Sequence, residues 1–278
     1  MTDHARETAL AWIGFKIVDR CDAQTALIVD HALARGAPIE VGLYFEDAQA
    51  LALLGAQLPQ SRAPIAAHLN HRQLSLLGIR HRESPLRAQL GIAAELGAAL
   101  VVTHLGNYPM TARQSLRERL WKELSEDLCF AETLASEYGL RLHIENTFHD
   151  LDFYRALLEA LETSGGSPPH LCCDIGHAKV WSSASLLEWL SFLEAQARRG
   201  AQLHFHLHAN RELADQHRPF TRPSEATDEI EDDFMQGMDW REALQRIDRR
   251  FPRAVKIFEV PPEETIAHYE HVMAALGR

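Results

Sequence analysis

Short apolar runs alternate with longer amphipathic segments along the chain. Eight runs have the length and composition of buried strands, and each precedes a segment with helical periodicity; they span residues 11–17, 38–45, 62–68, 99–104, 140–145, 170–174, 202–208 and 254–259. Ser84 and Pro85 predict a cap and a first helical residue, Gly139 the end of a long helix, and Asp239 a cap before Trp240. This order is typical of repeated βα units around a parallel sheet.

Eight strand and helix pairs in 278 residues predict an α/β fold, a single (β/α)8 TIM barrel that forms one domain over residues 1–278. A doubly wound open sheet is the alternative. It is disfavoured because the sequence has no GxGxxG or GxxxxGKS phosphate loop, and candidate functional residues follow strands along the whole chain. For the same reason we expect no residues dedicated to an organic cofactor.

Composition and charge narrow the function. The chain is 46% hydrophobic and 24% charged, and its formal net charge is −11, so duplex DNA is not an expected partner. The apolar stretch at residues 9–18 contains Lys16 and lacks the flanks of a signal peptide, and no run approaches the roughly 20 apolar residues of a membrane span. We therefore expect a cytoplasmic protein without a membrane partner, with its four cysteines reduced and mostly buried.

Histidines and carboxylates lie at the C-terminal ends of the later strands, which a parallel barrel brings to one face. His68 and His104 end the third and fourth strands, and Glu145 ends the fifth. Asp174 ends the sixth strand, with His177 three residues later. A buried Glu145 requires a positive partner, either a metal ion or an Arg or Lys. Asp174 alone would be interpreted as a helix cap.

The seventh strand reads HFHLHAN and projects three histidines to one side. We expect His206 to be a metal ligand, His208 to be the alternative ligand or a proton-transfer group, and His204 to lie deeper. Asp215 and His217 follow as a compact D-x-H pair. The full set of expected ligands is His68, His104, Glu145, Asp174, His177, His206, Asp215, His217 and Glu259. Asn146 is expected to support them, and His71 and His81 are interpreted as structural.

The pattern His, His, Glu, Asp-x-x-His, His, Asp-x-His, Glu resembles the xylose isomerase-like barrel superfamily, and more closely its endonuclease IV branch, over residues 62–260. The resemblance implies up to three divalent ions, with zinc expected and manganese or iron as alternatives. It assigns His68 and His104 to a first ion, Glu145 as a bridge to a second held by Asp174, His206 and Glu259, and His177, Asp215 and His217 to a third. It also implies in-line attack by a metal-activated water, and Glu145, His208 and Glu259 are the expected catalytic residues.

Two departures from the family pattern concern the substrate. Ala209 replaces an acidic residue that often follows the seventh strand, and residues 218–223 replace a glycine-rich GEG. The surrounding segment, residues 209–238, contains Arg218 and Arg222 and is interpreted as either a solvated loop or a substrate lid.

With the acidic chain, these departures favour a metal-dependent phosphodiesterase acting on a small molecule or a nucleotide-containing cofactor, for which the superfamily's phosphodiesterases of the cobamide nucleotide loop are a precedent. The alternatives, in order, are a divalent-metal sugar or sugar phosphate isomerase or epimerase, an abasic-site endonuclease, and a noncatalytic binding barrel.

Overall fold

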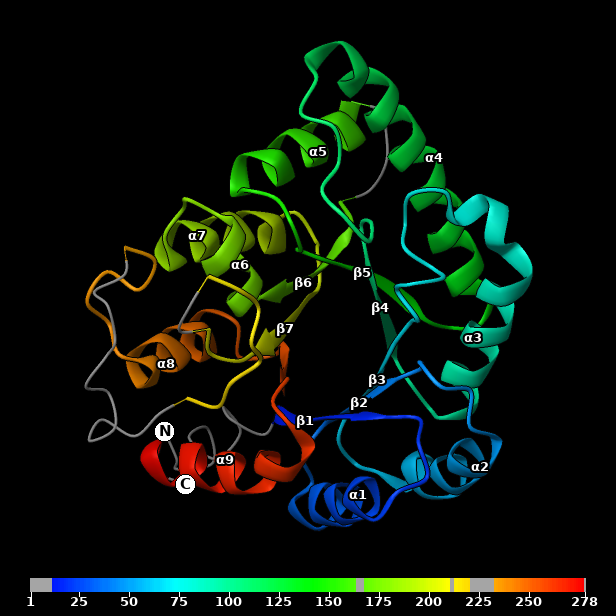
Figure 1. The fold of residues 1–278 in the computed structure, drawn as a ribbon, viewed down its shortest axis with the longest axis vertical. Coiled ribbons are helices and arrows are strands. Elements are labelled where there is room, and N and C mark those ends of the chain that lie inside the picture. Colours follow the sequence, from blue (N-terminus) through cyan, green and yellow to red (C-terminus); the bar gives the residue numbers. More distant parts are fainter. Residues whose placement is uncertain (1–11, 164–167, 211–212, 221–232, 278) are drawn as a thin grey trace.

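The chain forms a closed barrel of eight parallel strands in the order β1 to β8 (Figure 1). This computed structural model describes residues 12–163, 168–210, 213–220 and 233–277. The strands are β1 (Ile13–Val18), β2 (Ile39–Gly42), β3 (Ile65–His68), β4 (Leu100–His104), β5 (Arg141–Glu145), β6 (His170–Asp174), β7 (Leu203–Leu207) and β8 (Val255–Phe258). The predicted TIM barrel is confirmed, and each strand overlaps its predicted run.

Helices surround the barrel on its outer side (Figure 1). They are α1 (Ala23–Arg35), α2 (Ala48–Gln57), α3 (Glu83–Glu95), α4 (Gln114–Glu137), α5 (Leu151–Thr163), α6 (Ile175–Trp181), α7 (Leu186–Arg198), α8 (Trp240–Arg250) and α9 (Pro262–Ala275), with 3-10 turns at Leu58–Gln60 and Ile79–Arg82. The barrel closes where β8 pairs with β1, and there α9 lies beside α1, with Arg35 bonded to Glu270 at 2.5 Å. Among the described residues, none of the helices combines the length and apolarity needed to span a membrane.

Helix ends follow the predicted signals in two of three cases. The Asp239 side chain accepts a hydrogen bond from the Glu242 amide at 2.7 Å, and Gly139 follows α4 with a φ of 73°. The prediction for Ser84 is wrong, because the 3-10 turn at Ile79–Arg82 leads directly into α3, which begins at Glu83. Pro85 is still accommodated, since the first turn of a helix requires no amide donor there.

The barrel wall separates two chemically different regions. Outward-facing strand residues such as Phe15 and Phe205 pack against the helices in the main hydrophobic core. Inside the barrel, a small apolar cluster forms the floor: Ala66, Leu100, Val102 and Cys172. Charged and imidazole side chains fill the interior above this floor. The candidate functional groups therefore gather towards the C-terminal ends of the strands.

The four cysteines are all free thiols. Cys172 and Cys173 are buried in β6, whereas Cys21 and Cys129 are exposed. The expectation of reduced thiols agrees with this arrangement, but only two of the four are buried.

Candidate metal centre

The nine expected ligands converge at the C-terminal ends of the strands. They surround or lie just beneath a cavity of about 810 Å³ at the barrel mouth. Seven of them line the cavity directly: His68, His104, Glu145, His177, Asp215, His217 and Glu259. Asp174 and His206 are fully buried below it. Parallel strands therefore bring together residues that lie far apart in the sequence.

Glu145 is the centre of this arrangement. Its Oε2 atom lies 2.9 Å from Nε2 of His68 and 3.2 Å from Nε2 of His104, and its Oε1 atom lies 3.1 Å from Nδ1 of His177. Burial alone would raise the pKa of Glu145, but the positive charges of His104 and His206 hold it well below its ordinary value. Glu145 is therefore an ionised carboxylate in contact with several histidines that are also candidate ligands.

An inner group contains Glu145, Asp174, His206 and Glu259. Nδ1 of His206 faces all three carboxylates, at 3.5 Å from Glu145, 3.9 Å from Asp174 and 3.3 Å from Glu259. This buried nitrogen has no hydrogen-bond partner among the described residues. A buried imidazole nitrogen aimed at three carboxylates fits a divalent cation, because the cation satisfies all four groups at once.

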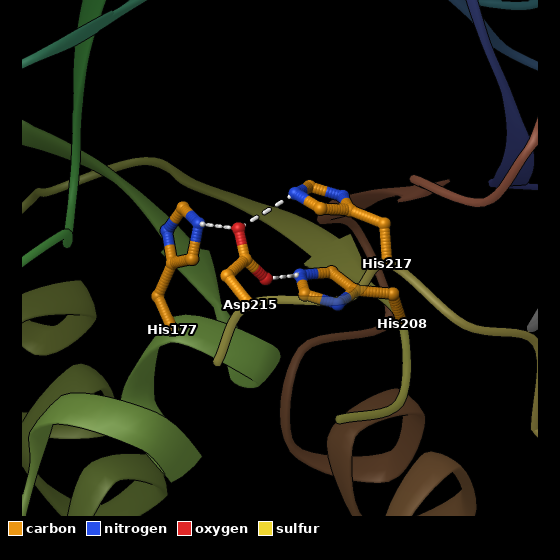
Figure 2. A group of neighbouring side chains, drawn as sticks. All are labelled: His177, His208, Asp215 and His217. Carbon is orange, nitrogen blue, oxygen red and sulfur yellow. Dashed lines mark hydrogen bonds and ion pairs between the residues drawn. The ribbon is translucent and has the colours of Figure 1, made fainter. Parts of the chain in front are cut away.

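A second group consists of His177, His208, Asp215 and His217. Figure 2 shows the three imidazole rings around the Asp215 carboxylate. Oδ2 of Asp215 lies 3.2 Å from Nε2 of His177 and 2.8 Å from Nε2 of His217, and Oδ1 lies 3.8 Å from Nε2 of His208. The predicted D-x-H pair, Asp215 and His217, thus lies next to His177.

His206 and His208 were expected to compete for one role, but the structure places them in different groups. His206 belongs to the inner group, whereas His208 belongs to the group around Asp215. Nε2 of His208 also lies 3.0 Å from both oxygens of Asp174, so this ring connects the two groups. His204 lies deeper, as predicted, and contacts Glu40.

Asp174 caps a helix and also belongs to the inner group of candidate ligands. Its Oδ1 accepts a hydrogen bond from the His177 amide at 2.7 Å and caps α6. Asn146 supports the same turn: its side chain donates to the Asp174 carbonyl at 2.9 Å and accepts from the Asp174 amide at 2.7 Å. The hydrogen bonds that fix this turn therefore also fix the orientation of the Asp174 carboxylate within the inner group.

A third group contains His68 and His104 together with His71. The Nδ1–H of His68 donates to the Leu69 carbonyl at 2.8 Å, and its Nε2 atom faces Oε2 of Glu145 at 2.9 Å. His71, expected to be structural, lines the cavity, whereas His81 is exposed outside it. The turn after β3 brings the His71 side chain next to His68 and His104.

Lys16 and Glu40 were not predicted as site residues, although both lie inside the centre. Nε2–H groups of His204 and His206 point to Oε2 of Glu40 at 2.7 and 3.0 Å. Lys16 pairs with Oε1 of Glu40 at 3.3 Å and forms a close ion pair with Glu259. In the sequence, each of these two residues is the single charged residue in an apolar run, IGFKIV or IEVG, and this was the signal that could have identified it as a site residue.

Electrostatic coupling links these unpredicted residues to the expected ligands. Burial would lower the pKa of His206, but the charges of Glu40 and Glu145 raise it to about 9. Burial would likewise lower the pKa of His177, and Asp174, Asp215 and Glu145 raise it well above its ordinary value. Without a metal ion, protonated imidazoles thus balance the buried carboxylates.

The loop after β7 is held over the mouth by an antiparallel bridge between Ala209 and Arg218, with N–O distances of 2.7 and 2.9 Å. The bridge positions Asp215 and His217 between its two ends. Arg222 and residues 221–232, which belong to the segment considered as a lid, lie outside the described residues.

Comparisons with known proteins agree with this architecture. The TTHB071 protein from Thermus thermophilus, in a structure soaked with ZnCl2, is 23% identical with a TM-score of 0.65, over 95% of this chain and 98% of that one. A D-tagatose 3-epimerase-like protein is 16% identical with a TM-score of 0.66, over 95% and 98% of the two chains. The 3-keto-D-glucoside 4-epimerase YcjR from E. coli is 13% identical with a TM-score of 0.61, over 95% and 98%.

At these identities the likeness concerns the fold. A search of curated protein sequences gives no match. The profile of the xylose isomerase-like TIM barrel, however, matches residues 64–275, which include all nine expected ligands. The chain therefore belongs to the xylose isomerase-like TIM-barrel family.

Proposed function

We propose that this protein is a metal-dependent phosphodiesterase that hydrolyses a small or medium-sized phosphodiester. The observation that carries the proposal is the central position of Glu145, whose two oxygens contact histidines from the other two groups. A carboxylate shared in this way suits a centre with several ions. Divalent ions held there would supply Lewis acidity to phosphoryl oxygens and would make water a better nucleophile at neutral pH.

The protein's own groups have distinct tasks in this proposal. Glu145, Asp174 and Glu259 would hold the ions through their negative charge. His208, bonded to Asp174 at 3.0 Å, is placed to move a proton next to the inner group. The Lys16 ammonium lines the cavity beside Glu259 and adds a positive charge that a phosphoryl oxygen can approach.

The cavity favours a compact substrate over duplex DNA. Its volume of about 810 Å³ lies within the usual range for small-molecule sites. Phe148 and Trp181 line one side as an edge-to-face pair with ring centroids 4.9 Å apart, and they offer a surface for a planar group. Because the protein has a net charge of −11, it matches a nucleotide-containing small molecule better than a polyanionic duplex.

The test is hydrolysis by the full chain after metal removal and reloading with zinc, manganese or iron. Bis(p-nitrophenyl) phosphate and a cobamide with its nucleotide loop serve as small diesters, and an abasic duplex at low salt serves as the DNA alternative. We expect metal-dependent turnover of a small diester with about three ions per chain, and its loss in Glu145→Ala with the fold retained. No turnover with any ion would overturn the proposal, and cleavage of the duplex alone would replace it with an endonuclease.

A sugar isomerase or epimerase is the second candidate. It is favoured by the inner group, which offers three carboxylates and one histidine to a single ion without the other two groups. Two of the similar structures are an epimerase and an epimerase-like protein, which supports this alternative. In such a reaction Glu145 and Glu259 would exchange a proton with a carbon next to a carbonyl. About one ion per chain, together with solvent deuterium entering a ketose, would establish this function instead.

A further inference from the structure

We infer that His71 is a fourth donor for the ion held by His68, His104 and Glu145. This inference depends on the metal centre and holds for either reaction. The ligand atoms of His68, His71 and His104 all lie within 4.8 Å of one another. Glu145 Oε2 is 2.9 and 3.2 Å from the Nε2 atoms of His68 and His104. Ligand atoms around a tetrahedral zinc ion with bonds of about 2.0–2.1 Å are separated by about 3.4 Å, so the two Glu145 distances already fit, and the three imidazoles would have to draw closer together around the ion.

The position of His71 is set by the turn that follows β3. Its ring centroid lies 5.8 Å from that of His68 and 4.3 Å from that of His104. It lines the cavity, and its Nδ1 atom is buried without a hydrogen-bond partner among the described residues. A buried imidazole nitrogen of this kind is costly unless a donor or a cation satisfies it.

Stacking is the competing role for this ring. The planes of His71 and His104 differ by only 9°, so His71 could simply hold His104 in place. Parallel rings direct their lone pairs side by side, and ion binding therefore requires His71 to turn about its Cβ–Cγ bond. A donor and a stacking partner differ in one testable respect, because only the donor needs its nitrogen atoms.

A fourth donor would give this ion three imidazoles and one carboxylate. Such a set closes a tetrahedral shell of nitrogen and oxygen ligands and favours zinc over magnesium or calcium, which prefer oxygen donors. An ion with this closed shell would have no open position for substrate and would therefore have a structural role in the centre.

The test compares His71→Ala, His71→Phe and His81→Ala in the full chain. Phenylalanine keeps a ring for stacking but removes both nitrogens, and His81 is an exposed histidine in the following 3-10 turn. Zinc stoichiometry and affinity are measured by competition with a chromophoric chelator, and the cobalt-substituted proteins are compared by visible absorption. Thermal unfolding of the metal-free proteins verifies that each variant folds.

We expect both His71 variants to lose one ion or to bind it at least 10-fold more weakly, with an altered cobalt spectrum, and His81→Ala to behave as the wild type. Wild-type affinity in His71→Phe would overturn the inference, and a defect confined to His71→Ala would assign stacking instead. These readouts are independent of turnover, so a failed phosphodiesterase assay leaves the inference intact.

Discussion

The carboxylate of Glu40 lies 3.0 Å from Nε2 of His206, whose other nitrogen, Nδ1, faces Glu145 and Glu259. When an ion displaces the second proton of His206, Glu40 would hold the remaining hydrogen on Nε2 and leave the Nδ1 lone pair for the ion. The Glu40→Gln substitution should weaken binding of the inner ion about 10- to 100-fold, as measured by chelator competition. Asp127→Asn is the control, because this buried carboxylate binds Arg80 outside the barrel. Equal losses in the two variants would show that Glu40 acts only through overall stability.

Lys16 pairs with Glu259 on one side and Glu40 on the other. Lys16→Met removes a positive charge beside the inner group, so we expect tighter binding of the inner ion. Turnover of an anionic diester should nevertheless fall about 100-fold in kcat, because a group that stabilises developing negative charge is lost. Lys256→Met is the matched control, since that buried lysine pairs with Asp248 at 3.0 Å outside the site. Unchanged kcat would limit Lys16 to a structural counter-ion role.

The contrast between Glu145 and Glu40 explains what the sequence could reveal. Glu145 ends an apolar run, and the ends of parallel strands meet at one face, so a polar residue there stands out. Glu40 lies inside its strand, flanked by Ile39 and Val41, where the side it faces depends on register. The pairing of β1 with β2 places Glu40 opposite Lys16, and no local pattern specifies that pairing.

His71 shows a second reason for the missed residues. His68 is located by the end of β3, but the position of His71 depends on the three-dimensional course of the following turn. The barrel itself was predictable because eight apolar runs with intervening helices allow few topologies. Contacts made by loops, such as the bridge that positions Asp215, come from tertiary packing.

Burial raises the pKa of Glu132, on α4, to about 7. Below pH about 4.5 the folded and unfolded states are both protonated, and as pH rises towards 7 the unfolded state ionises first, which destabilises the fold. Glu132→Gln should therefore raise the free energy of unfolding by about 1–3 kcal/mol at pH 8, a range that allows for solvent screening of this partly exposed group, and have little effect at pH 4. Urea unfolding at the two pH values measures this, with exposed Glu118→Gln on the same helix as the control. A gain independent of pH would contradict the assignment.

Gly176 allows the His208 ring to approach α6. A Cβ atom at this position would overlap the His208 imidazole, which is bonded to Asp174 at 3.0 Å. Gly176→Ala should displace the ring, cost about 1–3 kcal/mol in stability by overpacking and weaken metal binding by the group around Asp215. Gly55→Ala is the matched control, because a Cβ there meets nothing within 4 Å, and in the last turn of α2 it should stabilise the fold by up to about 0.5–1 kcal/mol. Chemical denaturation and zinc titration of both variants measure the two effects. Wild-type zinc binding in Gly176→Ala would show that the group around Asp215 does not need His208 in its present position.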